Sequence, residues 1–142
     1  MANRNFNQKQ YSYELEPVKI YGRFSVGAAG AVVAGKNGLG IKSVTKETTA
    51  GQYTIEFQDA FSKIMFLNSM IVDDAVTAVA RVQLLEDPAA LQADLKADKK
   101  LKIQCLDFAG AAVNPASGAQ VLFEVTMRQS RTAKERWCMV YL

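Results

Sequence analysis

The stretch Gln52-Tyr53-Thr54-Ile55-Glu56-Phe57-Gln58 decides the fold class of this 142-residue chain. Its apolar members, Tyr53, Ile55 and Phe57, occupy every second position, and polar residues stand between them. Because successive side chains of a β-strand point to opposite faces, this period of two indicates a strand with one face buried in a core.

Similar short runs, rich in β-branched and aromatic residues, lie on both sides of this stretch and are separated by turn signals such as Asn37-Gly38. The run at 64–72 is apolar on both faces and is predicted to be an interior strand. The remaining runs are 18–26, 31–34, 39–48, 78–85, 100–108 and 119–128. Seven or eight strands at this spacing predict a β-sandwich or a jelly roll.

The predicted fold is all-β: a single-domain antiparallel β-sandwich or jelly-roll-like fold with an extended N-terminal arm. Residues 1–16 form the arm, residues 17–130 the core, and residues 131–142 a C-terminal strand or a contact tail. A chain that is 49% hydrophobic at this length can bury about two thirds of its unfolded surface without a cross-link or metal. Residues 88–99 are expected to add one or two helical turns as a connection.

The two terminal segments hold the candidate partner-binding residues. Residues 1–13 are polar with isolated aromatics, so they cannot bury enough apolar surface to order by themselves, and we expect them to order on a partner. Residues 136–142 are largely apolar and are expected to pair into the sheet or into a neighbour. The candidate contact residues are Arg4, Phe6, Lys9, Tyr11, Tyr13, Arg131, Arg136 and Trp137.

The sequence contains no histidine, which argues against an enzyme. Its absence removes Ser-His-Asp and Cys-His nucleophile systems, His-ligated zinc and the usual general base near neutral pH. The adjacent acids Asp73-Asp74 and Glu86-Asp87 point to opposite faces if extended, so neither pair forms a catalytic dyad by itself. A weak calcium site in a loop is the alternative for these acids, but solvated strand ends are the simpler expectation. We therefore predict no catalytic residues, no metal site and no cofactor.

Residues 30–37 (GAVVAGKN) come close to the phosphate-binding pattern GxxxxGK[ST]. Asn37 replaces the hydroxyl that would hold magnesium, and Gly38 and Gly40 disfavour the helix whose N-terminus should meet the phosphate. These glycines are better explained as turn residues.

Net charge, targeting signals and cysteine content limit the class of protein further. The chain has 17 basic and 14 acidic residues, a net charge of +3, so nucleic acid is not the default partner. No signal-peptide pattern and no apolar run long enough to span a membrane is present, so a soluble protein made in the cytosol is expected. Cys105 and Cys138 are expected to be reduced and buried rather than paired.

Two segments carry a resemblance to known proteins. Residues 38–46 (GLGIKSVTK), followed by residues 51–57 (GQYTIEF), resemble a hairpin motif of tailed-bacteriophage virion proteins, among them head decoration (cement) proteins. Residues 121–130 (VLFEVTMRQS) look like the closing strand of the same modules. The motif is structural and carries no catalytic residue over, and the basic, aromatic tail after Ser130 departs from the common pattern.

The resemblance implies a capsid decoration protein that binds the outer head surface and bridges neighbouring capsid subunits. The resemblance implies the major capsid protein and further copies of the chain, often as a trimer in such proteins, as partners. The protein would be synthesised in the bacterial host cytoplasm and located on the capsid surface of the virion. A tail, fibre or portal-adaptor component would share the same β core and is the first alternative. A single-stranded nucleic-acid binding module is the second alternative, and it would need a basic groove lined with aromatics.

Overall fold

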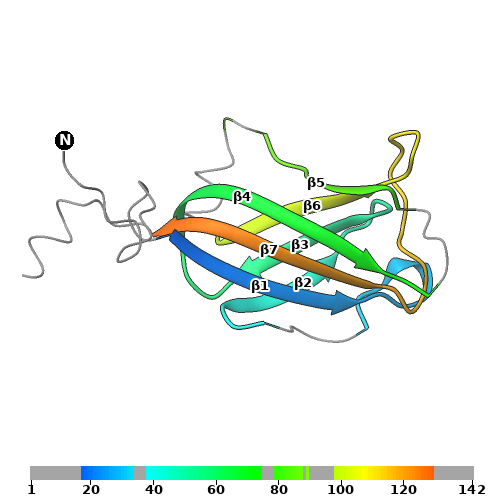
Figure 1. Ribbon diagram of the computed structural model, residues 1–142, viewed down its shortest axis with the longest axis horizontal. Helices are drawn as coiled ribbons and strands as arrows, with labels where there is room; N and C mark the ends of the chain where they lie inside the picture. The colour runs from blue at the N-terminus through cyan, green and yellow to red at the C-terminus, as the bar shows by residue number, and fades with distance from the viewer. Residues whose placement is uncertain (1–16, 34–37, 75–78, 88, 90–97, 130–142) are drawn as a thin grey trace, which may run out of the picture.

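A computed structural model describes residues 17–33, 38–74, 79–87, 89 and 98–129 of the chain (Figure 1). Within these residues the elements are seven strands and one short 3-10 turn. They are β1 (Pro17–Ser25), η1 (Ala28–Gly30), β2 (Ile41–Lys46), β3 (Gln52–Phe57), β4 (Phe61–Val72), β5 (Arg81–Leu84), β6 (Lys100–Leu106) and β7 (Gln120–Gln129).

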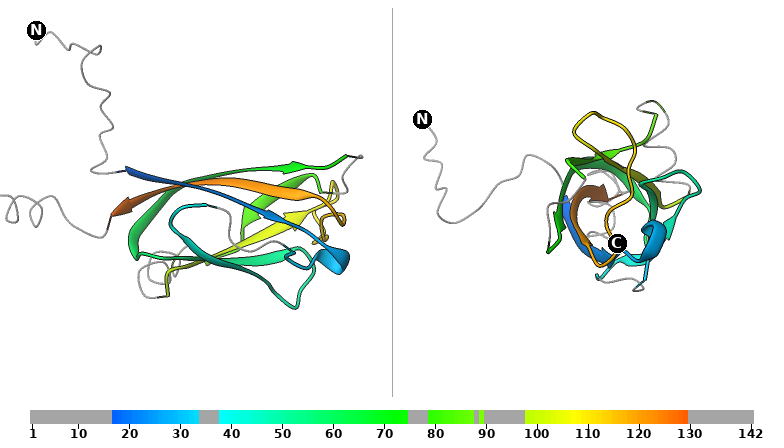
Figure 2. Two further views of the ribbon diagram at one scale, coloured as in Figure 1. Left: turned by 90° about the horizontal axis from the view of Figure 1, so that it is seen from below. Right: turned by 90° about the vertical axis from the view of Figure 1, so that its right-hand side faces the viewer.

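The strands form two antiparallel sheets that pack face to face, which confirms the prediction of an all-β sandwich (Figures 1 and 2). One sheet has the order β1-β7-β4 and the other the order β2-β3-β6-β5. The chain stays in one sheet through the β2-β3 and β5-β6 pairs and changes sheet at its other connections. Strands distant in sequence therefore become neighbours, as β1 and β7 do.

The core lies between the sheets and is built by the alternation seen in the sequence. Phe24 of β1 and Tyr53 of β3 come from opposite sheets, and their ring centroids lie 4.8 Å apart with no exposed surface on either side chain. The Tyr53 hydroxyl donates a hydrogen bond of 2.8 Å to the carbonyl oxygen of Gly30 in η1, so its one polar atom is satisfied inside the core. The buried side chains of β3 are those predicted from the period of two.

Gly22 allows the two sheets to approach closely. It faces inward from β1, and a Cβ atom at this position would lie 2.3 Å from both Ile41 Cδ1 and Phe123 Cζ. No real side chain fits at that distance, so the absence of a Cβ lets β1 lie directly over β2.

The prediction that residues 64–72 form an interior strand is wrong. Strand β4 lies at the edge of its sheet, and β7 is the central strand. The run is apolar on both faces because its inward side chains enter the core while several outward ones, Phe66 and Met70 among them, remain exposed. An apolar outer face looks, in sequence, like a second buried face.

Several sequence predictions concern positions outside the described residues. These positions include the arm, the C-terminal segment and most of the expected helical turn at 88–99. In the part of the chain that the structure describes, no helix is long and apolar enough to cross a membrane.

Candidate functional site

The outer face of the β1-β7-β4 sheet is the main candidate for a functional surface. The strand register aligns its outward side chains in rows that run across the three strands. One row consists of Tyr21, Glu124 and Asn68, and the next of Arg23, Leu122 and Met70. Rows on either side bring Phe66 beside Thr126 and Val72 beside Gln120.

This outer apolar face is defined here as Tyr21, Met65, Phe66, Met70, Val72 and Leu122. All of them except Leu122, which is half-buried, are exposed. The exposed fractions are 61% for Tyr21, 59% for Phe66, 58% for Met70 and 48% for Val72. Other exposed apolar residues, such as Leu39 and Phe108, lie outside the strands. Polar side chains, Asn68 and Glu124 among them, stand between these residues, so the face is a mixed surface with a large apolar share. Several large exposed apolar side chains gathered on one sheet are typical of an interaction surface, whereas single exposed residues are ordinary.

A register shift in β4 enlarges the outer apolar face. The pairing with β7 skips a residue between Ile64 and Phe66, so Met65 is an extra residue in β4. The shift leaves Met65 and Phe66 both exposed, although consecutive residues of a regular strand would point to opposite faces. The bulge therefore adds an apolar side chain to the surface.

Two shallow hollows mark this region. One, of about 210 Å³, lies across the sheet and is lined by residues of all three strands, including Tyr21, Met70 and Leu122. The other, of about 280 Å³, lies between β4 and β5 and includes Phe66 and Leu84 in its lining. The apolar surface thus continues from the sheet face around the edge of β4.

One ion pair lies within the outer apolar face, because Glu124 belongs to the central strand β7. The Lys19 ammonium lies 3.1 Å from Glu124 Oε1. The hydrogen bond to Glu124, and then the attraction of its charge, raise the pKa of Lys19 above its ordinary value. The lysine is solvent-exposed, so this pair orients two side chains and contributes little to stability.

The outer face of the other sheet has the opposite character. Its register aligns three glutamine side chains, Gln52, Gln104 and Gln83, in one row. A second row places Glu56 opposite Lys100. Such side chains keep their hydrogen bonds with water, so this face is the surface expected of a solvated sheet.

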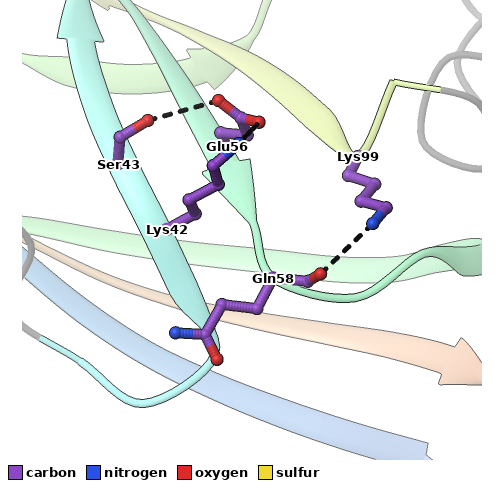
Figure 3. Close-up of polar contacts among 5 residues, drawn as sticks. All are labelled: Lys42, Ser43, Glu56, Gln58 and Lys99. Atoms are coloured by element: carbon purple, nitrogen blue, oxygen red, sulfur yellow. Dashed lines mark hydrogen bonds and ion pairs between the residues drawn. The ribbon is translucent and has the colours of Figure 1, made fainter.

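The ion pair on this polar face is drawn in Figure 3. Lys42 Nζ donates to Glu56 Oε1 at 2.8 Å, and the Ser43 hydroxyl donates to Glu56 Oε2 at 3.4 Å. The hydrogen bond from Lys42 is the main cause of a lowered pKa for Glu56. Nearby, Lys99 Nζ donates to the carbonyl oxygen of Gln58 at 3.4 Å.

The acidic pairs do not gather into a metal-holding cluster within the described residues. Asp73 Oδ2 is buried and accepts no hydrogen bond there, while Glu86 Oε1 accepts the backbone N–H of Lys102 at 2.8 Å. No three His, Cys, Asp or Glu side chains gather closely enough in that part of the chain to hold a metal ion. Glu86 is therefore a structural acceptor beside β6.

Two further sequence interpretations can be compared with the structure. Residues 41–46 form strand β2, whereas a phosphate-binding loop would continue into a helix. Gly38 and Gly40 lie in the bend and turn before β2, so the interpretation of these two glycines as turn residues is confirmed. Cys105 is buried and unpaired, as predicted, and burial raises the pKa of its thiol to about 11. Cys138 lies outside the described residues.

The candidate partner-binding residues of the two terminal segments all lie outside the described residues. The structure nonetheless fixes where those segments attach. Pro17, at the start of β1, pairs with Arg128, near the end of β7, so both segments join the same end of the β1-β7-β4 sheet (Figure 1). The sequence prediction missed the outer apolar face, and the signal that could have found it was the two-sided apolar run of β4.

Comparisons of the chain with family models, curated proteins and solved structures found no match.

Proposed function

We propose that this protein is a structural subunit of a bacteriophage virion, a capsid decoration protein that binds the outer head surface and bridges neighbouring capsid subunits. The observation that carries the proposal is the coincidence of two features on one sheet. The β1-β7-β4 sheet bears the outer apolar face, and both terminal segments attach at its end. A molecule built in this way acts through contact area, without a reaction centre.

The size of the outer apolar face supports contacts made by several parts of the molecule. Three strands about 4.8 Å apart and six residues at about 3.4 Å each give a face of roughly 14 Å by 20 Å, about 300 Å². A stable interface buries about 800 Å² on each partner, so this face alone is too small. The terminal segments can supply the missing area.

In this proposal the N-terminal segment lies across a capsid subunit. Its cations Arg4 and Lys9 would pair with capsid carboxylates, and the aromatics Phe6, Tyr11 and Tyr13 would fill apolar depressions. Arg131, Arg136 and Trp137 of the C-terminal segment have the same composition of cation and aromatic, and contact a neighbouring subunit.

The test is binding to empty heads of the phage that encodes the chain, measured by co-sedimentation. Removal of residues 1–13 leaves every described strand intact, so the circular dichroism spectrum and the melting temperature should not change. Occupancy on the heads should fall at least tenfold, equivalent to about 1.4 kcal/mol. Binding equal to that of the full chain would contradict the assignment.

A tail, fibre or portal-adaptor component is the competing proposal, because it would use the same β core and contact segments. Mass spectrometry of separated heads and tails distinguishes the two: the decoration protein should be found with the heads alone.

A further inference from the structure

The outward side of the β1-β7-β4 sheet carries an excess of positive charge that the rest of the described chain lacks. The described residues include ten basic and ten acidic side chains. Against one acid, Glu124, four of the basic side chains project outward from the strands of this sheet: Lys19, Arg23, Lys63 and Arg128. The remaining described side chains are six bases and nine acids, so the positive charge is concentrated on one surface.

The four cations, called the cationic margin below, lie beside the large apolar side chains and not among them. Lys19 and Arg23 stand on the edge strand β1, on either side of Tyr21. Lys63 and Arg128 form a row at the end of the sheet where β1 begins. Most of the outer apolar face belongs to β4, and Figure 1 shows β1 and β4 on opposite sides of β7. The surface is therefore cationic along one side and one end, and apolar along the other side.

Part of this charge is not compensated by the protein itself. Glu124 pairs with Lys19 at 3.1 Å. Within the described part of the chain, neither Arg23 nor Lys63 forms an ion pair, and both residues are exposed. An arginine in this situation can bind a carboxylate through two parallel hydrogen bonds, which fixes the geometry of the contact as well as its charge.

The polar residues in the middle of the surface favour a protein as the anionic partner. Glu124 and Asn68 share a row with Tyr21 and line the hollow of about 210 Å³ across the sheet. A lipid bilayer that covered the apolar side would also cover these two polar groups, and burying them without hydrogen-bond partners is costly. A nucleic acid would bring its phosphates against Glu124. A protein can supply hydrogen-bond donors there and apolar side chains elsewhere.

We propose that the outward side of this sheet docks on an acidic protein surface, whose carboxylates pair with the cationic margin while its apolar side chains pack on the outer apolar face. The proposal deepens the proposed function and rests on it for the partner, which is the capsid subunit. Lys19 and Arg23 are four residues apart, so the carboxylates that meet them lie about 13 Å apart. Such a charge pattern sets the orientation of the docked subunit and makes its association sensitive to salt.

The first part of the experiment compares two charge reversals in the full chain by co-sedimentation with phage heads and with separated tails. Arg23→Glu combined with Lys63→Glu reverses the charge of the cationic margin. Lys100→Glu combined with Lys102→Glu makes the same change on the polar face of the other sheet and is the matched control. The margin variant should bind heads at least tenfold more weakly than the control, and raised salt should reduce this difference. Equal binding by the two variants would overturn the inference and leave the proposed function standing.

The second part identifies the groups in contact by carbodiimide cross-linking of the bound, unchanged protein. This reagent joins a lysine amine to a carboxylate only where the two touch. Peptide mapping should find Lys63 joined to acidic residues of the capsid subunit at least about fivefold more often than Lys100, which is also exposed. Cross-linking of Lys63 to a tail protein instead would overturn the head location and support the acidic partner surface.

Two further outcomes decide against the inference. Phosphatidylglycerol vesicles and duplex DNA are offered to the same variants as alternative anionic partners. Binding to either that is lost in the margin variant, without such a loss on heads or tails, would identify a lipid or nucleic-acid surface and overturn the inference. Failure of the unchanged protein to bind heads or tails would overturn the proposed function together with the partner named here.

Discussion

The outer faces of the two sheets differ sharply although the same core lies beneath both. On the β2-β3-β6-β5 sheet the outward rows hold glutamines and the paired charges of Glu56 and Lys42, as in a surface in contact with water. On the β1-β7-β4 sheet the outward rows hold Tyr21, Phe66 and Met70, together with the Lys19–Glu124 ion pair. The sandwich needs apolar side chains only on its inner faces, so the fold does not require this difference.

In the β1-β7-β4 sheet the inner side stabilises the fold, whereas the outer side is the proposed contact surface. The inner side of β4 contributes Phe61 and Ile64 to the core, while its outer side contributes the exposed Phe66 and Met70. Covering one such large side chain is worth about 1.5–3 kcal/mol. The exposed parts of these side chains add nothing to the stability of the isolated subunit and become favourable only when a partner covers them.

The largest effect is expected from a substitution that damages the core shared by both faces. Phe24 is fully buried and contacts the Tyr53 ring of the opposite sheet. Phe24→Ala should lower the free energy of unfolding by about 3–5 kcal/mol, because it removes buried apolar surface and leaves a cavity. Urea denaturation measures the change. Phe108→Ala, at an exposed position, serves as the control, and an equal loss in both variants would contradict the proposed core.

A smaller effect is expected from the polar contact inside the core. Tyr53→Phe removes the hydroxyl that donates to the Gly30 carbonyl oxygen and keeps the ring. The variant should lose about 1–2 kcal/mol of stability, because a buried carbonyl oxygen then lacks this donor. Thermal unfolding measures the loss. A stability equal to that of the unchanged protein would mean that η1 is not held by this bond.

The smallest effect is expected on the polar outer face and depends on pH. The folded state lowers the pKa of Glu56 below its ordinary value, so its ionised form stabilises the fold above that value. This stabilisation is lost as the pH falls through the lowered pKa. Glu56→Gln should therefore flatten the acid side of the stability profile slightly, and added salt should reduce the difference. An unchanged acid limb at low salt would show that the Lys42 pair contributes nothing.

The sequence was sufficient to predict most of the strands, although the described part of the expected run at 31–34 contributes only an isolated bridge between Val32 and Val26. The strict alternation around Tyr53 marks β3 because only one of its faces meets the core, and the pattern in β7 marks a strand for the same reason. These are properties of neighbouring residues, so no knowledge of distant pairing is needed to recognise them.

The arrangement of the strands could not be predicted in this way. The order β1-β7-β4 joins strands from opposite ends of the chain, and no local pattern encodes that pairing. The edge position of β4 was mistaken for an interior one because an apolar contact face and a buried face have the same composition. The bulge at Met65, which brings a second apolar side chain to the surface, also leaves no signal in hydrophobic periodicity.

The most direct test of the outer apolar face as the contact surface compares two charges placed on opposite sides of the molecule. Met70→Glu introduces a carboxylate into the outer apolar face, and Gln104→Glu introduces the same group into the polar face. Both variants should melt at the temperature of the unchanged protein. In co-sedimentation with phage heads, Met70→Glu should weaken binding at least tenfold, about 1.4 kcal/mol, and Gln104→Glu should bind normally. Equal binding by the two variants would contradict the account.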